Sequence, residues 1–287
     1  MTKLNLFVIL LLAIQLHSCA QPADTLKQEV DTTEYSNWIK LAKGVEFIEM
    51  SAPQKSILGD SKLSILRLEP EQLQFFMYNA TQFNKTRMTA PEWADSFDLN
   101  IVMNAGMYDL ANGLIHRGYL KNGEHFNNKT VNPSYNSMIA FTPKDSSNNN
   151  FEILDLKCEN WAEVCDQYTC YAQGMRMIDC NGEAMGWNKR NQSCSMLVAA
   201  KDEKGRIWFI FSRSPYTHNH MISFMGAFKE DLRNAIYLEG GPETSLYIDI
   251  KDHCIEKIGS YVSQTYANDN NKDFWDLPNI IGIKVKQ

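Results

Sequence analysis

The stretch of the sequence that points most clearly to chemistry covers residues 234–248. An apolar segment there ends at the carboxylate of Glu239, and Gly240 and Gly241 follow directly. Two adjacent glycines let the backbone turn tightly and present N–H groups outward, which suits an anionic or hydroxyl-rich ligand. The same residues also fit a plain strand–loop–strand corner with a glutamate that faces solvent. From these residues alone, both interpretations stay open.

A second polar corner follows the apolar run at residues 99–104. It reads Asn104-Ala105-Gly106-Met107-Tyr108, and His116 and Arg117 come soon after it. Taken singly, His116 is more often a surface or structural histidine, and Arg117 is more often an ion-pair partner. Together these residues offer an amide, an imidazole and a guanidinium, and a guanidinium is a natural clamp for a phosphate.

Two histidines at alternating positions, His218 and His220, form a third pattern. Such a pair could reach one metal ion, but the sequence offers no clear third ligand, which a zinc site needs. An exposed loop is therefore the favoured interpretation. We expect no metal and no other cofactor.

Short strands must position these corners. Alternating apolar and polar residues predict strands at 45–50 and 64–68, and a third strand is expected at 73–78. The clearest hairpin has its arms at 195–200 and 207–212, joined by the turn Asp202-Glu203-Lys204-Gly205.

Helices are predicted in only a few places. Pro91 and Glu92 favour a helix start within residues 89–97, and Phe224, Phe228 and Leu232 recur at helical spacing within residues 223–232. Strands with a few helices predict an α+β fold. The expected architecture is a single domain with a mixed, strand-rich sheet and a few flanking helices around a surface cleft.

The first residues differ from the rest of the chain. Lys3 precedes an apolar run too short to span a bilayer, and Leu16-His17-Ser18-Cys19 resembles the lipobox of bacterial lipoproteins. We expect a lipoprotein signal peptide over 1–18, a lipidated Cys19 with a flexible tether over 19–40, and the globular domain over 41–287. The anchor would hold the protein in the bacterial cell envelope, on the periplasmic side or at the outer-membrane surface. Ordinary cleavage and release of a secreted product is the alternative.

Charge and cysteine content narrow the class of protein further. The 287 residues carry a formal net charge of -6, which gives no general attraction to nucleic acid. Of the seven cysteines, six remain when Cys19 is set aside, and five of these lie between Cys158 and Cys194. An even number in an oxidising envelope suggests disulfides, with free buried thiols as the alternative, and the connectivity stays open.

Five motifs follow one another in an order that resembles the phosphodiester glycosidase family: Asn104-Ala105-Gly106-Met107-Tyr108, residues 118–123, Gln173-Gly174-Met175-Arg176-Met177-Ile178 with Asn181-Gly182, the hairpin from Ser195, and Leu238-Glu239-Gly240-Gly241. The resemblance extends over residues 104–248. In that family the last corner usually reads Asp-Gly-Gly-Gly-Ser. Here Glu239 stands in place of the Asp, and Pro242 and Glu243 replace a Gly and a Ser.

The resemblance implies a hydrolase that cleaves the bond between a sugar's anomeric carbon and a phosphodiester oxygen. It implies Glu239 as the first candidate for the catalytic carboxylate, Glu243 as the second and Asp109 as the third. Asn104 would hold sugar hydroxyls or order the loops. The residues expected to bind the substrate are Gly106, Tyr108, His116, Arg117, Arg176, Ser195, Gly240, Gly241, Thr244 and Ser245. Tyr108, Tyr119 and Trp187 are candidates to stack on sugar rings. A non-catalytic envelope lipoprotein that binds glycans through the same pocket is the alternative.

Overall fold

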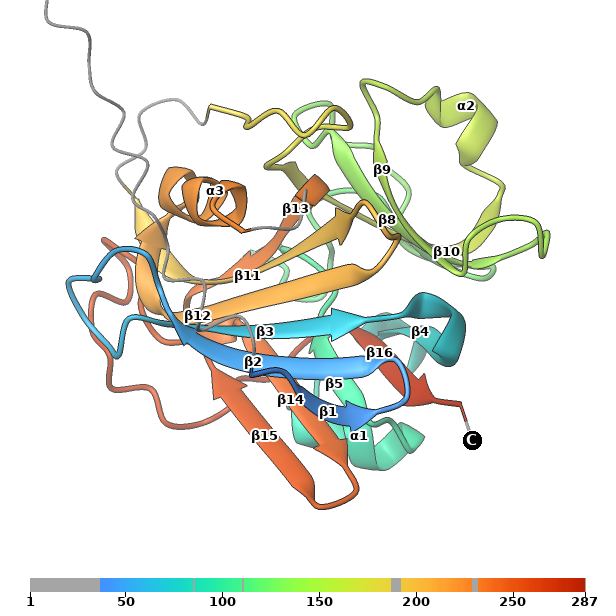
Figure 1. Ribbon diagram of the computed structural model, residues 1–287. Helices are drawn as coiled ribbons and strands as arrows, with labels where there is room; N and C mark the ends of the chain where they lie inside the picture. The colour runs from blue at the N-terminus through green and yellow to red at the C-terminus, as the bar shows by residue number, and fades with distance from the viewer. Residues whose placement is uncertain (1–36, 85, 110, 187–191, 229–231, 287) are drawn as a thin grey trace, which may run out of the picture.

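A computed structural model describes residues 37–84, 86–109, 111–186, 192–228 and 232–286 (Figure 1). The export segment, Cys19, most of the predicted tether and Trp187 lie outside the described residues. The described chain is packed from its start, because the Trp38 ring lies 5.4 Å from the Trp208 ring and the Arg67 guanidinium lies 3.8 Å over Trp38. Within the described ranges, every helix is too short or too polar to cross a bilayer.

The larger of the two sheets has eleven strands, and its neighbours pair antiparallel. β8 (Ser137–Pro143) pairs with β10 and with β9 (Phe151–Asp155), off the main path. The main path runs in the order β1 (Ile39–Ala42), β2 (Val45–Ser51), β3 (Lys62–Leu68), β12 (Ile207–Thr217), β11 (Ser193–Asp202), β13 (Leu232–Gly240), β10 (Tyr168–Arg176), β6 (Leu120–Asn122) and β7 (His125–Asn128).

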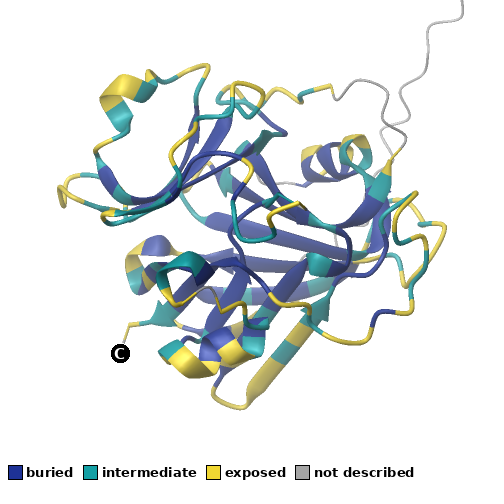
Figure 2. Cartoon of the chain, turned by 180° about the vertical axis from the view of Figure 1, so that it is seen from behind, coloured by how far each residue is buried: buried dark blue, intermediate teal, exposed yellow. Residues whose placement is uncertain are grey.

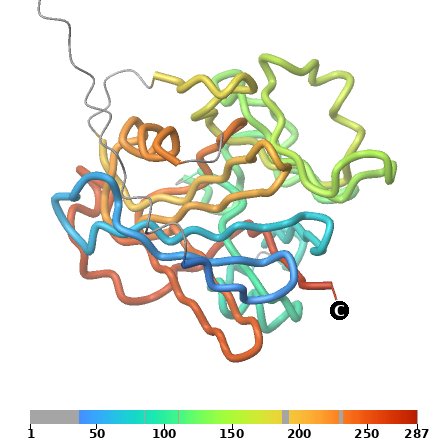
Figure 3. Tube along the Cα trace, in the orientation of Figure 1, coloured from blue at the N-terminus to red at the C-terminus, as the bar shows by residue number. Residues whose placement is uncertain are grey.

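The smaller sheet has five strands and is also antiparallel. Its order is β15 (His253–Ile258), β14 (Ser245–Ile250), β5 (Ile101–Asn104), β16 (Asn279–Val285) and β4 (Leu73–Asn79). The C-terminal strand β16 therefore lies between β4 and β5, far from it in the sequence, as the trace in Figure 3 shows.

The main core lies between the two sheets. It combines Leu66, Leu197 and Phe209 of the larger sheet with Met77 and Ile281 of the smaller one. Figure 2 shows these inner strands as buried and the loops and strand ends as exposed. Burying apolar surface between two sheet faces is the main source of stability in such a fold.

Three α-helices of the described chain cover outer faces. α1 (Ala90–Phe97) packs Trp93 with Val102 and Ile280 of the smaller sheet, and α3 (His218–Gly226) packs Phe224 in one cluster with Trp208. α2 (Trp161–Val164) lies beside the cluster of β8 and β10, and short 3-10 turns occur at Pro70–Gln72, Ala80–Gln82 and Gly241–Glu243.

The predicted α+β class is wrong, because the described residues form a mostly β fold of two antiparallel sheets. The strands expected at 45–50, 64–68 and 73–78, the 195–212 hairpin and the helix at 89–97 are confirmed. The helix expected at 223–232 is wrong in its bounds, since α3 ends at Gly226 and Leu232 begins β13, opposite Asp202 of β11. Pairing in the sheet decided the structure of Leu232, because tertiary context overrides local spacing.

Candidate active site

The two glycine-containing corners of the sequence lie side by side, and Asn104 joins them. Asn104 ends β5, and its side chain is 2% exposed. Its Nδ2 donates to the carbonyl oxygen of Glu243 at 2.9 Å, and its Oδ1 accepts from the N–H of Ser245 at 2.7 Å. Both amide atoms are therefore used to hold the loop that carries Glu243. Of the two roles expected for Asn104, this geometry matches the ordering of the loops.

Glu239 lies at the end of β13 and is only 8% exposed. Burial raises its pKa to about 8, and the neighbouring Glu243 carboxylate adds to the increase, while the Gly240 N–H and Arg117 act in the opposite direction. Burial also raises the pKa of Glu243, which is the more exposed of the two. A carboxyl pair with these environments holds a proton at neutral pH, and the more buried Glu239 keeps it.

This raised pKa makes the stability of the fold depend on pH. Below its ordinary pKa of 4.5, the Glu239 carboxyl group is protonated in both the folded and the unfolded chain. Between pH 4.5 and about 8, this group is ionised in the unfolded chain but still protonated in the folded chain. Its contribution to the free energy of unfolding is thus fully present below 4.5 and is lost as the pH rises through about 8.

Glu239→Gln removes the titration, so we expect the variant to gain stability relative to the wild type between pH 5 and pH 9. The expected gain in thermal midpoint is at least about 2–4 °C, which is the shift that 1 kcal/mol produces in domains of this size. Thermal unfolding of both proteins at the two pH values checks this. A constant difference between them would show that Glu239 ionises normally.

The two glycines after Glu239 are required for steric reasons. A Cβ at Gly240 would lie 2.1 Å from the Tyr237 hydroxyl oxygen, and Gly241 has a φ of +83°, which favours glycine. The Gly240 N–H donates to Oε1 of Glu239 at 3.0 Å. This N–H therefore orients the carboxyl group.

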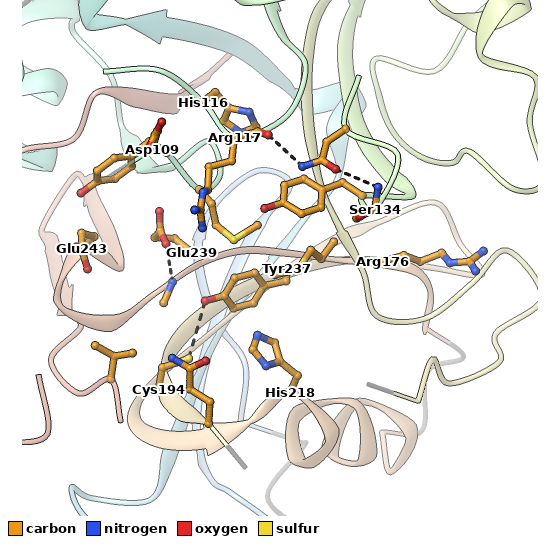
Figure 4. A pocket seen from close by; sticks show the side chains of 18 of the residues that line it. Asp109, His116, Arg117, Ser134, Arg176, Cys194, His218, Tyr237, Glu239 and Glu243 are labelled. Atoms are coloured by element: carbon orange, nitrogen blue, oxygen red, sulfur yellow. Dashed lines mark hydrogen bonds between the residues drawn. The ribbon is translucent and has the colours of Figure 1, made fainter. Parts of the chain in front are cut away.

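The acid pair opens into a cleft of about 1060 Å³. Arg117 is exposed, and Figure 4 shows its side chain pointing toward Glu239. His218 lies below Tyr237 in the same view. Within the described ranges, no hydrogen bond or ion pair engages the Arg117 guanidinium. It is therefore available for an anionic group of a ligand. The predicted site residues that line this cleft are Tyr108, Asp109, His116, Arg117, Arg176, Glu239, Gly240 and Glu243.

Arg176 borders the cleft but points away from Glu239 (Figure 4). Its Nη1 donates to both carboxylate oxygens of Asp155 at 2.8 and 2.6 Å, and the Asp155 side chain is fully buried. The guanidinium thus neutralises a buried acid at the end of β9.

Three further predicted residues lie beneath the cleft lining. Ser195 is fully buried, and its Oγ accepts from the N–H groups of Ser260 and Tyr261 at 3.0 and 3.1 Å. Thr244 and Ser245 are fully buried as well, and Ser245 Oγ donates to the Glu243 carbonyl oxygen at 3.1 Å. The hydroxyls of Ser195 and Ser245 thus bind backbone groups beneath the cleft and do not face a ligand.

His116 and Gly106 support the first corner. His116 is 1% exposed, and its Nδ1 accepts from the N–H of Gly118 at 3.0 Å. Burial lowers its pKa to about 4, so the ring is neutral at physiological pH. Gly106 has a φ of +133°, and a Cβ there would lie 2.4 Å from Nε2 of His116. Only a glycine leaves room for this buried imidazole.

Tyr237 and Cys194 are among the lining residues that sequence reasoning missed. Tyr237 stands two positions before Glu239 on β13, and both residues line the cleft although the register with β11 shifts between them. The Cys194 sulfur lies 3.9 Å from the Tyr237 hydroxyl oxygen, and burial raises the pKa of the thiol to about 12. Neither residue had a clear local signal, because the register shift interrupts the alternation between Tyr237 and Glu239, and Cys194 is brought near by the pairing of β11 with β13.

The histidines considered for metal binding lie at the start of α3. The His218 ring packs 4.6 Å from Tyr237, and the His220 ring stacks at 6.3 Å with Phe224. In the ranges that the structure describes, three potential ligands come together at Asp155, Cys158 and Cys180. The two cysteines there form a disulfide, while Cys165, Cys170, Cys194 and Cys254 are free thiols, so the expectation of disulfides is confirmed for one pair.

The model of the phosphodiester glycosidase family matches residues 97–284, which include both corners and the acid pair. The chain belongs to this family. No curated protein matches the sequence significantly.

Two solved structures resemble this chain in fold. The catalytic domain of zebrafish N-acetylglucosamine-1-phosphodiester alpha-N-acetylglucosaminidase, auto-inhibited by its pro-peptide, superposes with a TM-score of 0.56 at 12% identity over 88% of this chain and 86% of that one. A hypothetical protein from Synechocystis has a TM-score of 0.54 at 10% identity and covers 87% of this chain and 64% of its own. At these identities the likeness shows the fold alone.

Proposed function

We propose that this protein hydrolyses the glycosidic bond of a sugar-1-phosphodiester. The observation that carries the proposal is the buried Glu239, protonated at neutral pH beside Glu243, at the edge of an open cleft with the Arg117 guanidinium. Two carboxyl groups of different pKa are what an acid–base hydrolysis of a glycosidic bond requires. Membership in the phosphodiester glycosidase family supports the same reaction class.

In the proposed reaction, Glu239 donates its proton to the bridging oxygen as the bond between that oxygen and the anomeric carbon breaks. The phosphate monoester leaves with this proton. Because a phosphate is already a good leaving group, the assistance is smaller than for an alcohol. The gain comes mainly from stabilising charge around the transition state.

Glu243 takes the complementary role. As the more exposed acid of the pair, it ionises first, and its carboxylate stabilises the positive charge that develops on the sugar ring. It accepts a proton from the attacking water, whose oxygen ends on the anomeric carbon. Arg117 binds the non-bridging phosphate oxygens, a pairing for which a guanidinium is suited.

The test is to incubate the mature protein with a panel of sugar-1-phosphodiesters, nucleotide sugars included, and to measure released sugar. The first substrate to try is an N-acetylglucosamine-1-phosphodiester, because the zebrafish enzyme is named for one. Release of the free sugar with a phosphate monoester is the expected result. Binding of these compounds with no turnover of any would support a non-catalytic glycan-binding protein instead.

We further propose that the protein works in the bacterial cell envelope, anchored by a lipid on Cys19. The apolar run before Leu16-His17-Ser18-Cys19 supports this. In bacterial cells, fatty acid label should enter the wild type and be absent from Cys19→Ser. Equal labelling of both proteins, or labelling of neither, would contradict the anchor.

A further inference from the structure

The loop of residues 52–61 joins β2 to β3 and carries two adjacent apolar side chains in solvent. Ile57 is 75% exposed and Leu58 is 38% exposed, and Ile57 has the largest exposed fraction among the exposed large apolar residues of the described chain. Figure 1 shows the loop projecting beyond the edge of the strands that it joins. Single exposed apolar residues are common on protein surfaces, whereas an adjacent pair on a projecting tip indicates contact with an apolar partner.

The tip is fastened to β12 on both of its sides. On one side, Ser56 Oγ donates to the Pro215 carbonyl oxygen at 2.8 Å. On the other side, the Ser61 N–H donates at 2.8 Å to Oγ of Ser214, which is fully buried. The backbone at Gly59 lies so close to Ser214 that a Cβ there would be 2.5 Å from its Oγ. The base of the loop is therefore fixed, and the apolar pair between its two sides is held outward.

The loop lies on the side from which the chain enters the domain. β1 begins at Ile39, opposite Phe47 of β2, and β2 ends at Ser51 beside the loop. Because β1 and β2 are antiparallel, the chain reaches Ile39 from the end of β2 that carries the loop. Cys19, the proposed site of the lipid, precedes this entry point in the sequence. The anchor and the tip thus approach a bilayer from the same side of the domain.

The charge and the size of the tip favour a lipid partner. Residues 52–61 hold one cation, Lys55, and one anion, Asp60, and both are exposed, so the loop has no net charge. A stable interface with a second copy or with another protein buries about 800 Å² on each partner. Two side chains on a projecting tip offer far less area than this. They are sufficient, however, to insert at the boundary between lipid head groups and acyl chains.

We propose that Ile57 and Leu58 insert into the surface of a phospholipid bilayer and orient the anchored domain on it. The inference rests on the proposed lipid anchor and is independent of the proposed hydrolysis. The pair alone binds weakly, but a lipid on the same chain holds the tip near the bilayer, so the second contact forms within one molecule. Pairing across β3, β12, β11 and β13 places Gly240 on the same edge of the larger sheet as the loop. The acid corner then lies on the edge of the sheet that faces the membrane.

The first test follows the tip in the lipidated mature protein, reconstituted into phosphatidylcholine vesicles. Ile57→Trp adds one tryptophan to the six of the chain. Brominated acyl chains quench tryptophan on contact, so the fluorescence that the substitution adds over the wild type should be lost in vesicles of dibrominated phosphatidylcholine. Glu203→Trp is the control, because Glu203 is exposed in the turn at the opposite end of β12. The fluorescence that this control adds should be the same in both kinds of vesicle.

The second test needs no lipid on the protein. It uses the mature chain, residues 19–287, with Cys19→Ser, and measures its partition onto phosphatidylcholine vesicles by sedimentation. Replacing Ile57 and Leu58 together by serine should lower the partition coefficient about tenfold or more, because both side chains lose their transfer into the lipid. Salt should leave the partition unchanged, since an apolar contact is not screened. Lys55→Ser, the matched control in the same loop, should also leave it unchanged. All these sites are exposed, so the variants should keep the parent's thermal midpoint.

Equal partition of the parent and the double serine variant would overturn the proposal, as would Ile57→Trp fluorescence that is the same in brominated and ordinary vesicles. A double variant that converts a dimer to a monomer in the absence of vesicles would also overturn it, because the tip would then contact a second copy. Failure of the anchor gives a different result. If the wild type takes up no fatty acid label, the lipid on Cys19 is refuted, and the partition of the Cys19→Ser chain still decides about the tip.

Discussion

Replacing Glu239 by glutamine is expected to lower kcat for a sugar-1-phosphodiester by about 10²-fold, the low end of the usual range for a general acid, because a phosphate needs less help to leave than an alcohol. Glutamine has the same size but carries no acidic proton, so the leaving phosphate would depart without protonation. The Gly240 N–H, which donates to Oε1 of Glu239, can donate in the same way to the amide oxygen of glutamine. The corner should therefore keep its shape, and KM should change much less than kcat.

The matched control for this variant is Glu203→Gln. Glu203 is exposed in the turn of the β11–β12 hairpin, and the register of β11 with β13 places that turn at the end far from Gly240. Its kcat should equal that of the wild type. A Glu239→Gln variant that binds and turns over substrate like the wild type would refute the acid role. Binding without turnover in both the wild type and the variant would favour a glycan-binding protein.

Arg176→Ala is expected to lower the free energy of unfolding by about 3–5 kcal/mol, the usual cost of removing one partner of a buried ion pair. Asp155 is fully buried, and its carboxylate would remain without the two hydrogen bonds from Arg176 Nη1. The backbone N–H groups of Lys157 and Cys180, which also donate to Asp155, would compensate only in part. Urea unfolding measures the change.

Arg117→Ala is the natural comparison, because it removes the same side chain from an exposed position on the cleft. We expect it to change stability by less than about 0.5 kcal/mol and to lower kcat/KM instead. The two arginines thus separate a structural from a substrate-binding role. If Arg176→Ala folded with normal stability and lost activity, the role expected from the sequence would be correct and the structural role wrong.

The candidate carboxylate could be found from the sequence because its signals are local. An apolar strand that ends in Glu239 and is followed by two glycines predicts an acid at a tight corner, and the structure places it there, 8% exposed. Its raised pKa could not be predicted, because it depends on how completely the surrounding strands exclude water and on the distance from Glu243.

Ser195 and Arg176 show where local patterns could not indicate the partner of a side chain. Ser195 and Arg176 belong to the motifs of the resemblance, yet the structure uses Ser195 to bind two backbone N–H groups and Arg176 to bind Asp155, 21 residues away. A hydroxyl or a guanidinium serves a ligand or a structural partner equally well. Which one it meets is fixed by contacts between distant segments.

The sequence by itself determined the strands at 45–50, 64–68 and 73–78, the main hairpin, the helix within residues 89–97 and the family to which the chain belongs. These follow from side-chain periodicity, turn residues and motif order, all of which act over a few neighbouring positions. Only the tertiary structure decided that the strands form two antiparallel sheets, that Leu232 joins a strand and not a helix, and that Asn104 holds the Glu243 loop. Each of these depends on backbone pairing or hydrogen bonds between residues far apart in the chain, and local patterns do not encode such partners.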